Sequence, residues 1–138
     1  MKVQVIRSNR KTIGLEVRAD ESVILRAPAV DEISDVEWKR ILGEFTERVN
    51  HFCKVMDVTV GRITIRNQKT RWGSCSSKGN VNFNYQLYYM PRELMDYVII
   101  HELSHRRHMN HSAEFWQEVE KYCKTYRECR KKLRDYEI

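Results

Sequence analysis

The chain has 138 residues, a formal net charge of +6 and a hydrophobic content of 41%, which fits one globular domain with its own core. No apolar run approaches the roughly 18 residues needed to span a bilayer, so the sequence argues against a membrane protein. The N-terminal segment MKVQVIRSNRK lacks the apolar core of a signal peptide, and we therefore expect a cytoplasmic protein. A monomer is the expected oligomeric state, although no sequence feature specifies it.

The positive charge would suit a nucleic-acid partner, but an ordinary basic protein explains it better. Basic residues are spread along the whole chain, apart from Arg106-Arg107 and residues 127–134. The four cysteines show no Cys-x-x-Cys spacing, so in a reducing compartment we expect free thiols. A second zinc site at Cys123 and Cys129 is the less favoured alternative.

The first 30 residues contain three segments with the alternating pattern of β-strands, at residues 2–7, 12–18 and 23–27. We expect them to form a small antiparallel sheet in which residues 8–11 make the first turn. Ser34 and Glu37 then have the spacing of a capping box, which predicts a helix over residues 34–56. Its apolar residues recur every three or four positions, so one face should be buried.

Residues 58–88 alternate again and predict an antiparallel meander of three strands. The first runs from 58 to 66 with a bulge at Gly61, where the alternation slips. The second covers residues 70–76, and a turn at 78–80 leads to the third, which has one apolar and one polar face.

Two helices are predicted over residues 91–125. Pro91 suits the first turn of a helix that runs from 92 to 109 and is apolar on most sides, so it should lie inside the domain. Asn110 should end it, because Asn tolerates the left-handed conformation. Ser112 then caps a second helix, and residues 126–138 form a charged helical tail that frays.

The first of these helices carries His101, Glu102 and His105 in the order His-Glu-x-x-His. Positions four apart lie on one helix face, so both imidazoles can reach one metal ion, with Glu102 beside them. His111 follows six residues later and is the third candidate ligand. Three protein ligands with a water in the fourth position are typical of a catalytic zinc. Glu102 would then accept a proton from the metal-activated water.

Five segments together resemble the YgjP-like metallopeptidase family, which is related to the SprT and WLM zinc peptidases. They are Arg71-Trp-Gly-Ser-Cys-Ser-Ser77, Asn80-Val-Asn-Phe-Asn84, Asp96-Tyr-Val98, His101-Glu-Leu-x-His105 and Asn110-His-Ser112 with Phe115-Trp116. The resemblance covers roughly residues 60–125. It implies a single α+β domain of the zincin type, with a small antiparallel sheet packed on the central helix. It also implies zinc at His101, His105 and His111, Glu102 as general base, and a peptide or protein substrate.

Two other functions stay open. One is a zinc-bearing binding module without turnover, against which Glu102 argues, since a purely structural site does not need this carboxylate. The other is a DNA-associated protease like the SprT and WLM relatives, although no separate DNA-binding motif is visible. A membrane partner is not expected.

Several residues near the motif have no single predicted role. Asn82 and Asn84 either assist a substrate that pairs with strand 80–88 or simply face solvent. Cys75 is either a buried hydrophobe or an inhibitory zinc thiolate, and Trp72 is expected to pack rather than to hold substrate. Glu114 and Glu118 are candidates to orient the ligand imidazoles, and His51 and His108 are not expected to bind metal. The spacing leaves four candidates for a second oxyanion donor: Arg71, Tyr85, Tyr88 and Tyr89.

Overall fold

The computed structural model describes residues 6–7, 12–13, 16–17, 23–24 and 27–136. Strand β1 (Ile6–Arg7) pairs antiparallel with β2 (Thr12–Ile13), and β3 (Glu16–Val17) pairs antiparallel with β4 (Val23–Ile24). Both ladders are antiparallel, as predicted, and residues 14–15, which would join β2 and β3 into the predicted strand 12–18, lie outside the described residues. The predicted turn at residues 8–11 and the outer parts of the predicted strands lie outside the described residues.

Helix α1 (Asp35–Met56) begins and ends close to where the sequence predicts. The Ser34 hydroxyl accepts a hydrogen bond from the Glu37 amide at 3.1 Å, so the predicted cap is present. The second bond of the capping box, from the Ser34 amide to the Glu37 carboxylate, is not formed. The Glu37 carboxylate instead accepts a hydrogen bond from the Tyr89 hydroxyl. Asp57 ends the helix in the left-handed conformation, with φ of 57°. The buried face is the predicted one and comprises Ile41, Phe45, Val49, Phe52 and Met56.

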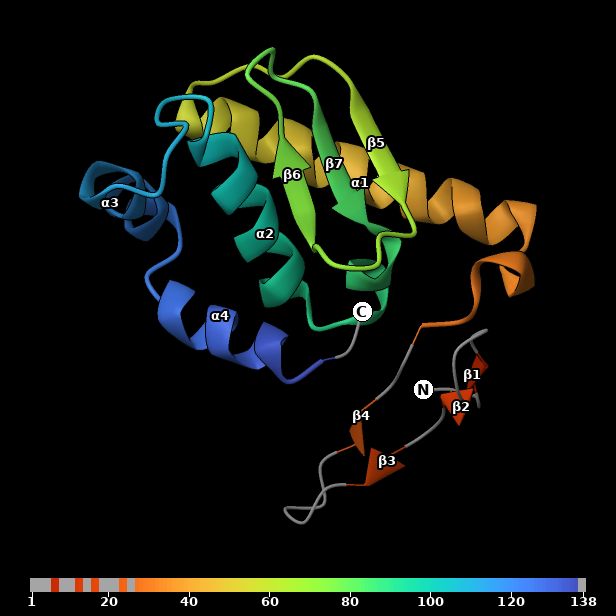
Figure 1. Ribbon diagram of the computed structural model, residues 1–138. Coiled ribbons are helices and arrows are strands. Elements are labelled where there is room, and N and C mark those ends of the chain that lie inside the picture. Colours follow the sequence, from red (N-terminus) through yellow and green to blue (C-terminus); the bar gives the residue numbers. More distant parts are fainter. Residues whose placement is uncertain (1–5, 8–11, 14–15, 18–22, 25–26, 137–138) are drawn as a thin grey trace.

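The central sheet contains β5 (Ile63–Arg66), β6 (Gly73–Cys75) and β7 (Val81–Asn84) in the order β5-β7-β6 (Figure 1). Strand β7 pairs parallel with β5 and antiparallel with β6. The predicted meander is wrong, because the chain crosses from β5 to the far side of the sheet before it returns through the middle. The third strand is also shorter than predicted, since a 3₁₀ helix, Tyr85–Tyr89, begins directly after Asn84.

Gly61 is not a bulge, because the first strand begins only at Ile63. The Gly61 amide instead donates to the carbonyl of Gly79 at 2.8 Å. A Cβ atom at position 61 would lie only 2.4 Å from Oδ1 of Asn80. A side chain at position 61 would therefore displace the Asn80 amide group, whose oxygen accepts from the Arg62 amide at 2.8 Å.

Helix α2 (Arg92–Ser104) lies at the centre of the fold and contacts α1, β6, β7 and the two C-terminal helices, α3 (Ala113–Tyr122) and α4 (Tyr126–Arg134) (Figure 1). Its sequence is apolar on most sides because it is packed on most sides. Helix α1 packs beside α2 on the same face of the sheet, where the rings of Phe45 and Phe83 stack with centroids 5.7 Å apart. None of the described helices is both long and apolar enough to cross a membrane.

Residues 126–134 are not a frayed tail. They form α4, which buries Tyr126, Cys129 and Leu133 against the rest of the domain. These residues recur at intervals of three and four, as expected for one face of a helix. The fold is thus a small α+β domain in which α4 completes the core around α2.

Candidate metal centre

The three predicted ligands come together at the end of α2. One nitrogen from each of His101, His105 and His111 lies within 4.8 Å of the others. Nε2 of His101 and Nε2 of His111 are 3.3 Å apart. Two nitrogens bound tetrahedrally to zinc at about 2.0–2.1 Å lie about 3.3–3.4 Å from each other. The three side chains therefore fit a single divalent ion.

Two of the imidazoles are oriented by groups on their far nitrogens. Nδ1 of His105 lies 3.0 Å from the carbonyl of His108, and this contact requires a proton on Nδ1. Nε2 of His105 is then unprotonated and free to bind a metal. Nδ1 of His101 lies 3.2 Å from the hydroxyl of Tyr97, one helical turn earlier. The expected partners Glu114 and Glu118 are therefore wrong for these two histidines.

Burial favours the neutral form of His101 and His105. Burial, together with the neighbouring His105 and His111, lowers the pKa of His101 to about 3. Burial also lowers the pKa of His105. Neutral imidazoles are the form that binds a metal, so the site is prepared for a cation.

The turn that brings His111 back differs from the prediction. Helix α2 ends at Ser104, five residues before the predicted end, and His105 is its C-cap. Asn110 does not adopt the left-handed conformation, because Asp57 alone does so among the described non-glycine residues. The chain reverses through a turn in which the amide of His108 donates to the carbonyl of Ser104.

Arg106 and Arg107 hold this turn against the end of α1. The Arg107 guanidinium donates to the carbonyls of Met56 and Asp57 at 3.0 and 2.9 Å. Nε of Arg106 donates to the carbonyl of Thr59 at 2.8 Å. These basic residues therefore have a structural role that their charge alone does not reveal.

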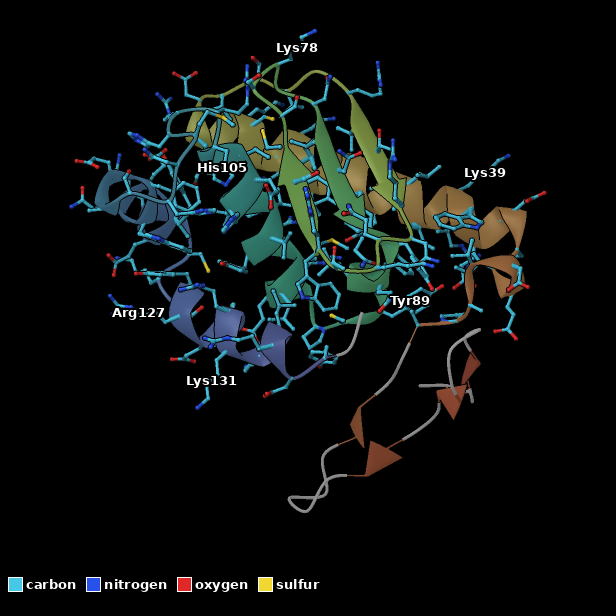
Figure 2. The ribbon with its side chains drawn as sticks, in the orientation of Figure 1. Lys39, Lys78, Tyr89, His105, Arg127 and Lys131 are labelled. Atoms are coloured by element: carbon cyan, nitrogen blue, oxygen red, sulfur yellow. The ribbon has the colours of Figure 1, made fainter. Side chains whose placement is uncertain are left out.

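Helix α3 supplies the wall behind the ligands. Its N-terminus is capped by the predicted Ser112, whose hydroxyl accepts from the amide of Phe115. The Phe115 ring is fully buried and stacks on His105 with centroids 4.5 Å apart. Trp116 stacks on His111 at 5.9 Å. Figure 2 shows His105 next to the chain that leads from α2 into this helix.

Glu102 is buried, with 6% of its surface exposed, and lines a cavity of about 300 Å³ together with His101. Burial raises its pKa to about 8, and the positive charge of Arg71 opposes this shift. Strand β6 lies directly against it, since a Cβ on Gly73 would be 3.2 Å from Cγ of Glu102. A carboxyl group whose pKa lies close to neutral pH is suited to accepting and returning a proton.

The asparagines of the resembling segments are structural. Asn84 is fully buried, and its amide donates to the carbonyls of Gln68 and Arg71 at 3.0 and 3.1 Å. It therefore fixes the loop before Trp72. Asn82 donates to the hydroxyl of Ser74 at 3.1 Å. Neither the substrate-binding nor the solvent-facing role predicted for Asn84 is correct.

Trp72 and the four candidate oxyanion donors differ in where their side chains lie. Trp72 packs against the core, as expected, and also lines the cavity. Tyr85 donates to the carbonyl of Pro28 and Tyr89 to Glu37, so both hydroxyls are engaged elsewhere. Tyr88 packs edge-on against Tyr89. Arg71 is the candidate oxyanion donor whose charge acts on Glu102.

The four cysteines are free thiols, as expected. Burial raises the pKa of Cys75, and the nearby Glu102 raises it further, which disfavours the thiolate that would bind zinc. The thiols of Cys123 and Cys129 both lie 3.8 Å from the hydroxyl of Thr125. Among the described residues, the histidine cluster is the group with metal-binding geometry.

The sequence did not reveal the C-terminal wall of the cavity, formed by Arg130, Leu133 and Arg134 of α4. The spacing of Tyr126, Cys129 and Leu133 could have indicated that α4 packs on the domain. The identity of the surface it covers depends on tertiary structure. Tyr97 was also missed, although its position four residues before His101 places both on one helix face.

Comparison with known proteins gives two similar structures and a family. A crystal structure of the metallopeptidase zymogen abylysin of Pyrococcus abyssi matches with a TM-score of 0.59 and 25% identity, over 64% of this chain and 90% of that chain. The metallopeptidase zymogen jannalysin of Methanocaldococcus jannaschii matches with a TM-score of 0.58 and 23% identity, over 66% and 94%. Comparison with curated proteins gives no match. The family model for the YgjP-like metallopeptidase domain matches residues 26–136, and the chain therefore belongs to the YgjP-like metallopeptidase family.

Proposed function

We propose that this protein is a zinc-dependent peptidase in which His101, His105 and His111 hold the metal and Glu102 is the general base. The observation that carries the proposal is the 3.3 Å approach of two imidazole nitrogens beside a buried carboxylate. Membership of a metallopeptidase family supports a divalent metal and a peptide substrate. The whole of residues 26–136 acts as one catalytic domain in this proposal.

Zinc in this position would lower the pKa of a water molecule to about 7 and polarise the substrate carbonyl. Glu102 takes the proton of the attacking water and later delivers it to the leaving amine. Its raised pKa of about 8 supports the second of these steps, since the protonated form persists near neutral pH. Arg71 is our candidate for stabilising the developing oxyanion.

An extended substrate would lie along β6 rather than along the predicted strand 80–88. Strand β7 is central and is paired on both sides. Two backbone hydrogen bonds join the ends of β6 to β7. The Asn84 amide donates to the Trp72 carbonyl and the Ser76 amide donates to the Asn80 carbonyl, each at 2.9 Å. By the alternation of an antiparallel ladder, Gly73 and Cys75 turn their backbone groups to the opposite edge of β6. These are the groups that a substrate strand would pair with.

The test is cleavage of an internally quenched peptide library by purified protein, before and after chelation and after addition of zinc. We expect cleavage that is lost on chelation and restored by zinc. Glu102→Gln should keep zinc and lose at least about 100-fold in kcat, because proton transfer contributes about 10²–10⁴-fold. Glu47→Gln, on the exposed face of α1, is the matched control and should retain activity.

The same experiment separates the alternatives. A binding module would hold zinc without cleaving any peptide, and wild type and Glu102→Gln would then behave alike. A DNA-associated protease would show salt-dependent DNA binding as well as cleavage. Full activity in the Glu102→Gln variant would remove Glu102 from its proposed role.

A further inference from the structure

Two arginines of α4 face the same cavity as the proposed catalytic residues. Arg130 and Arg134 lie one helical turn apart, and both line the cavity of about 300 Å³ that His101 and Glu102 also line. The helix that carries them is anchored by Tyr126, Cys129 and Leu133, which are at most 7% exposed. The backbone positions of both arginines are therefore fixed relative to the proposed metal site, although the two residues are exposed.

Aromatic packing holds Arg130 in place. Its Cζ atom lies 4.5 Å above the ring of Trp116, and that ring stacks on Tyr126 with centroids 5.2 Å apart. Arg130 also lines the same cavity as His101 and Tyr97. The stacking places its guanidinium against Trp116, whose ring also stacks on His111.

This arrangement is unfavourable without an anion. Like charges four residues apart on a helix repel each other by a few tenths of a kcal/mol. Within the described part of the chain, neither guanidinium forms an ion pair with a carboxylate. Lys132, on the same helix, does pair with Glu93 at 3.0 Å. The two arginines that face the cavity therefore keep their charge available.

The size of the cavity fits a small group of a peptide, and its two arginines favour an anionic one. Its walls include the apolar side chains of Val98 and Leu133 and the ring of Trp72. A cavity of about 300 Å³ is at the lower end of the range for small-ligand sites and accommodates one side chain or a chain end. Guanidinium groups bind carboxylates through paired, charge-assisted hydrogen bonds.

We infer that Arg130 and Arg134 form a subsite that recognises a carboxylate of the peptide substrate, which makes them specificity-determining residues. The inference rests on the proposed peptidase function. The carboxylate belongs either to an Asp or Glu side chain next to the scissile bond or to the C-terminus of the substrate. Both sources have the same chemistry, and matched peptides distinguish them.

Binding to the chelator-treated, metal-free protein is the first test, because it does not depend on turnover. Calorimetric titration at low ionic strength would compare acetyl-AAEAA-amide with acetyl-AAQAA-amide, and acetyl-AAAAA free acid with its amide. We expect at least about tenfold tighter binding of the acidic member in one of the two pairs, as for a charge-assisted contact. The pair that shows the difference identifies the source of the carboxylate.

The arginines are then tested by substitution. Arg130→Gln, Arg134→Gln and the double variant should reduce this discrimination, and the double variant should abolish it. Lys131→Gln is the matched control, because Lys131 is an exposed residue of the same helix whose side chain points away from the domain (Figure 2). In the zinc-loaded protein, the same variants should lower kcat/KM for the preferred acidic peptide more than for its neutral partner.

The outcomes separate this inference from the proposed function. Cleavage of neutral peptides with no acid preference, or a preference that survives in the double variant, would overturn the carboxylate subsite and leave the peptidase intact. If wild type cleaves no peptide but still binds the acidic peptide in an arginine-dependent way, the proposed peptidase function is wrong and the carboxylate subsite stands. Arginine-dependent binding of a single-stranded DNA oligonucleotide without peptide discrimination would also contradict the inference.

Discussion

The hydroxyl of Tyr97 lies 3.2 Å from Nδ1 of His101, one turn away on the same helix. This contact fixes the ring so that Nε2 faces His111. Loss of the groups that orient metal-binding histidines typically costs about 10–100-fold in metal affinity. We therefore expect Tyr97→Phe to bind zinc about tenfold more weakly, measured by competition with a chromophoric chelator. Tyr88→Phe is the control and should bind like wild type. Equal affinity in both variants would show that the hydroxyl does not orient His101.

Arg107 connects three parts of the site. It bonds to Met56 and Asp57 at the end of α1, and its Nε lies 3.5 Å from the buried carboxylate of Glu118 on α3. We expect Arg107→Gln to lower the free energy of unfolding by about 1–2 kcal/mol, since it removes bonds made by a partly exposed charged group. The measurement is urea denaturation of the metal-free protein.

Lys39→Gln is the matched control for this experiment, because it removes one positive charge from the exposed face of α1 (Figure 2). It should leave the unfolding midpoint unchanged. Arg107→Gln should also weaken zinc binding, because the turn before His111 loses its attachment to α1. If Arg107→Gln is as stable as the control, the Arg107 side chain does not stabilise the turn before His111, and the backbone hydrogen bonds of the turn are sufficient.

The buried carboxyl of Glu102 predicts a pH dependence for the metal-free protein. Its pKa is about 8 in the fold and 4.5 as a model value, so between these pH values the folded chain holds the proton more tightly. The stability contributed by this group is therefore present below pH 4.5 and is lost as pH rises towards 8. The Glu102→Gln variant should not lose stability in this way, because glutamine does not ionise.

The prediction is measured as the difference in unfolding free energy between the metal-free variant and metal-free wild type at several pH values. As pH rises from 5 to 8, the free energy of unfolding of the variant should increase relative to that of wild type by more than about 1 kcal/mol, since one pKa unit corresponds to about 1.4 kcal/mol. A difference that stays constant with pH would mean that Glu102 is ionised in the fold at every pH tested.

The sequence predicts the helices of this fold better than its sheet. The cap at Ser34 and the apolar spacing of α1 are local signals, and both are confirmed. Strand order is not local. Strands β5 and β7 pair in parallel because the chain crosses the sheet between them, and no spacing rule specifies that crossing.

The three histidines could be predicted because four-residue spacing on a helix is geometric. The way His111 returns could not, because it depends on Arg106 and Arg107 bonding to carbonyls some fifty residues earlier. The role of Asn84 was hidden for the same reason, since its partners are carbonyls of a preceding loop. The arginines of α4 became candidates only when their helix was seen against α2.

Zinc titration of the single-histidine variants tests the central claim most directly. Wild type should bind one zinc ion per chain. His101→Ala, His105→Ala and His111→Ala should each lose at least about 100-fold in affinity, because each removes one of the three protein ligands of a catalytic zinc. His51→Ala and His108→Ala, whose imidazoles lie outside the cluster, should bind like wild type. Wild-type affinity in His111→Ala would contradict the three-histidine site.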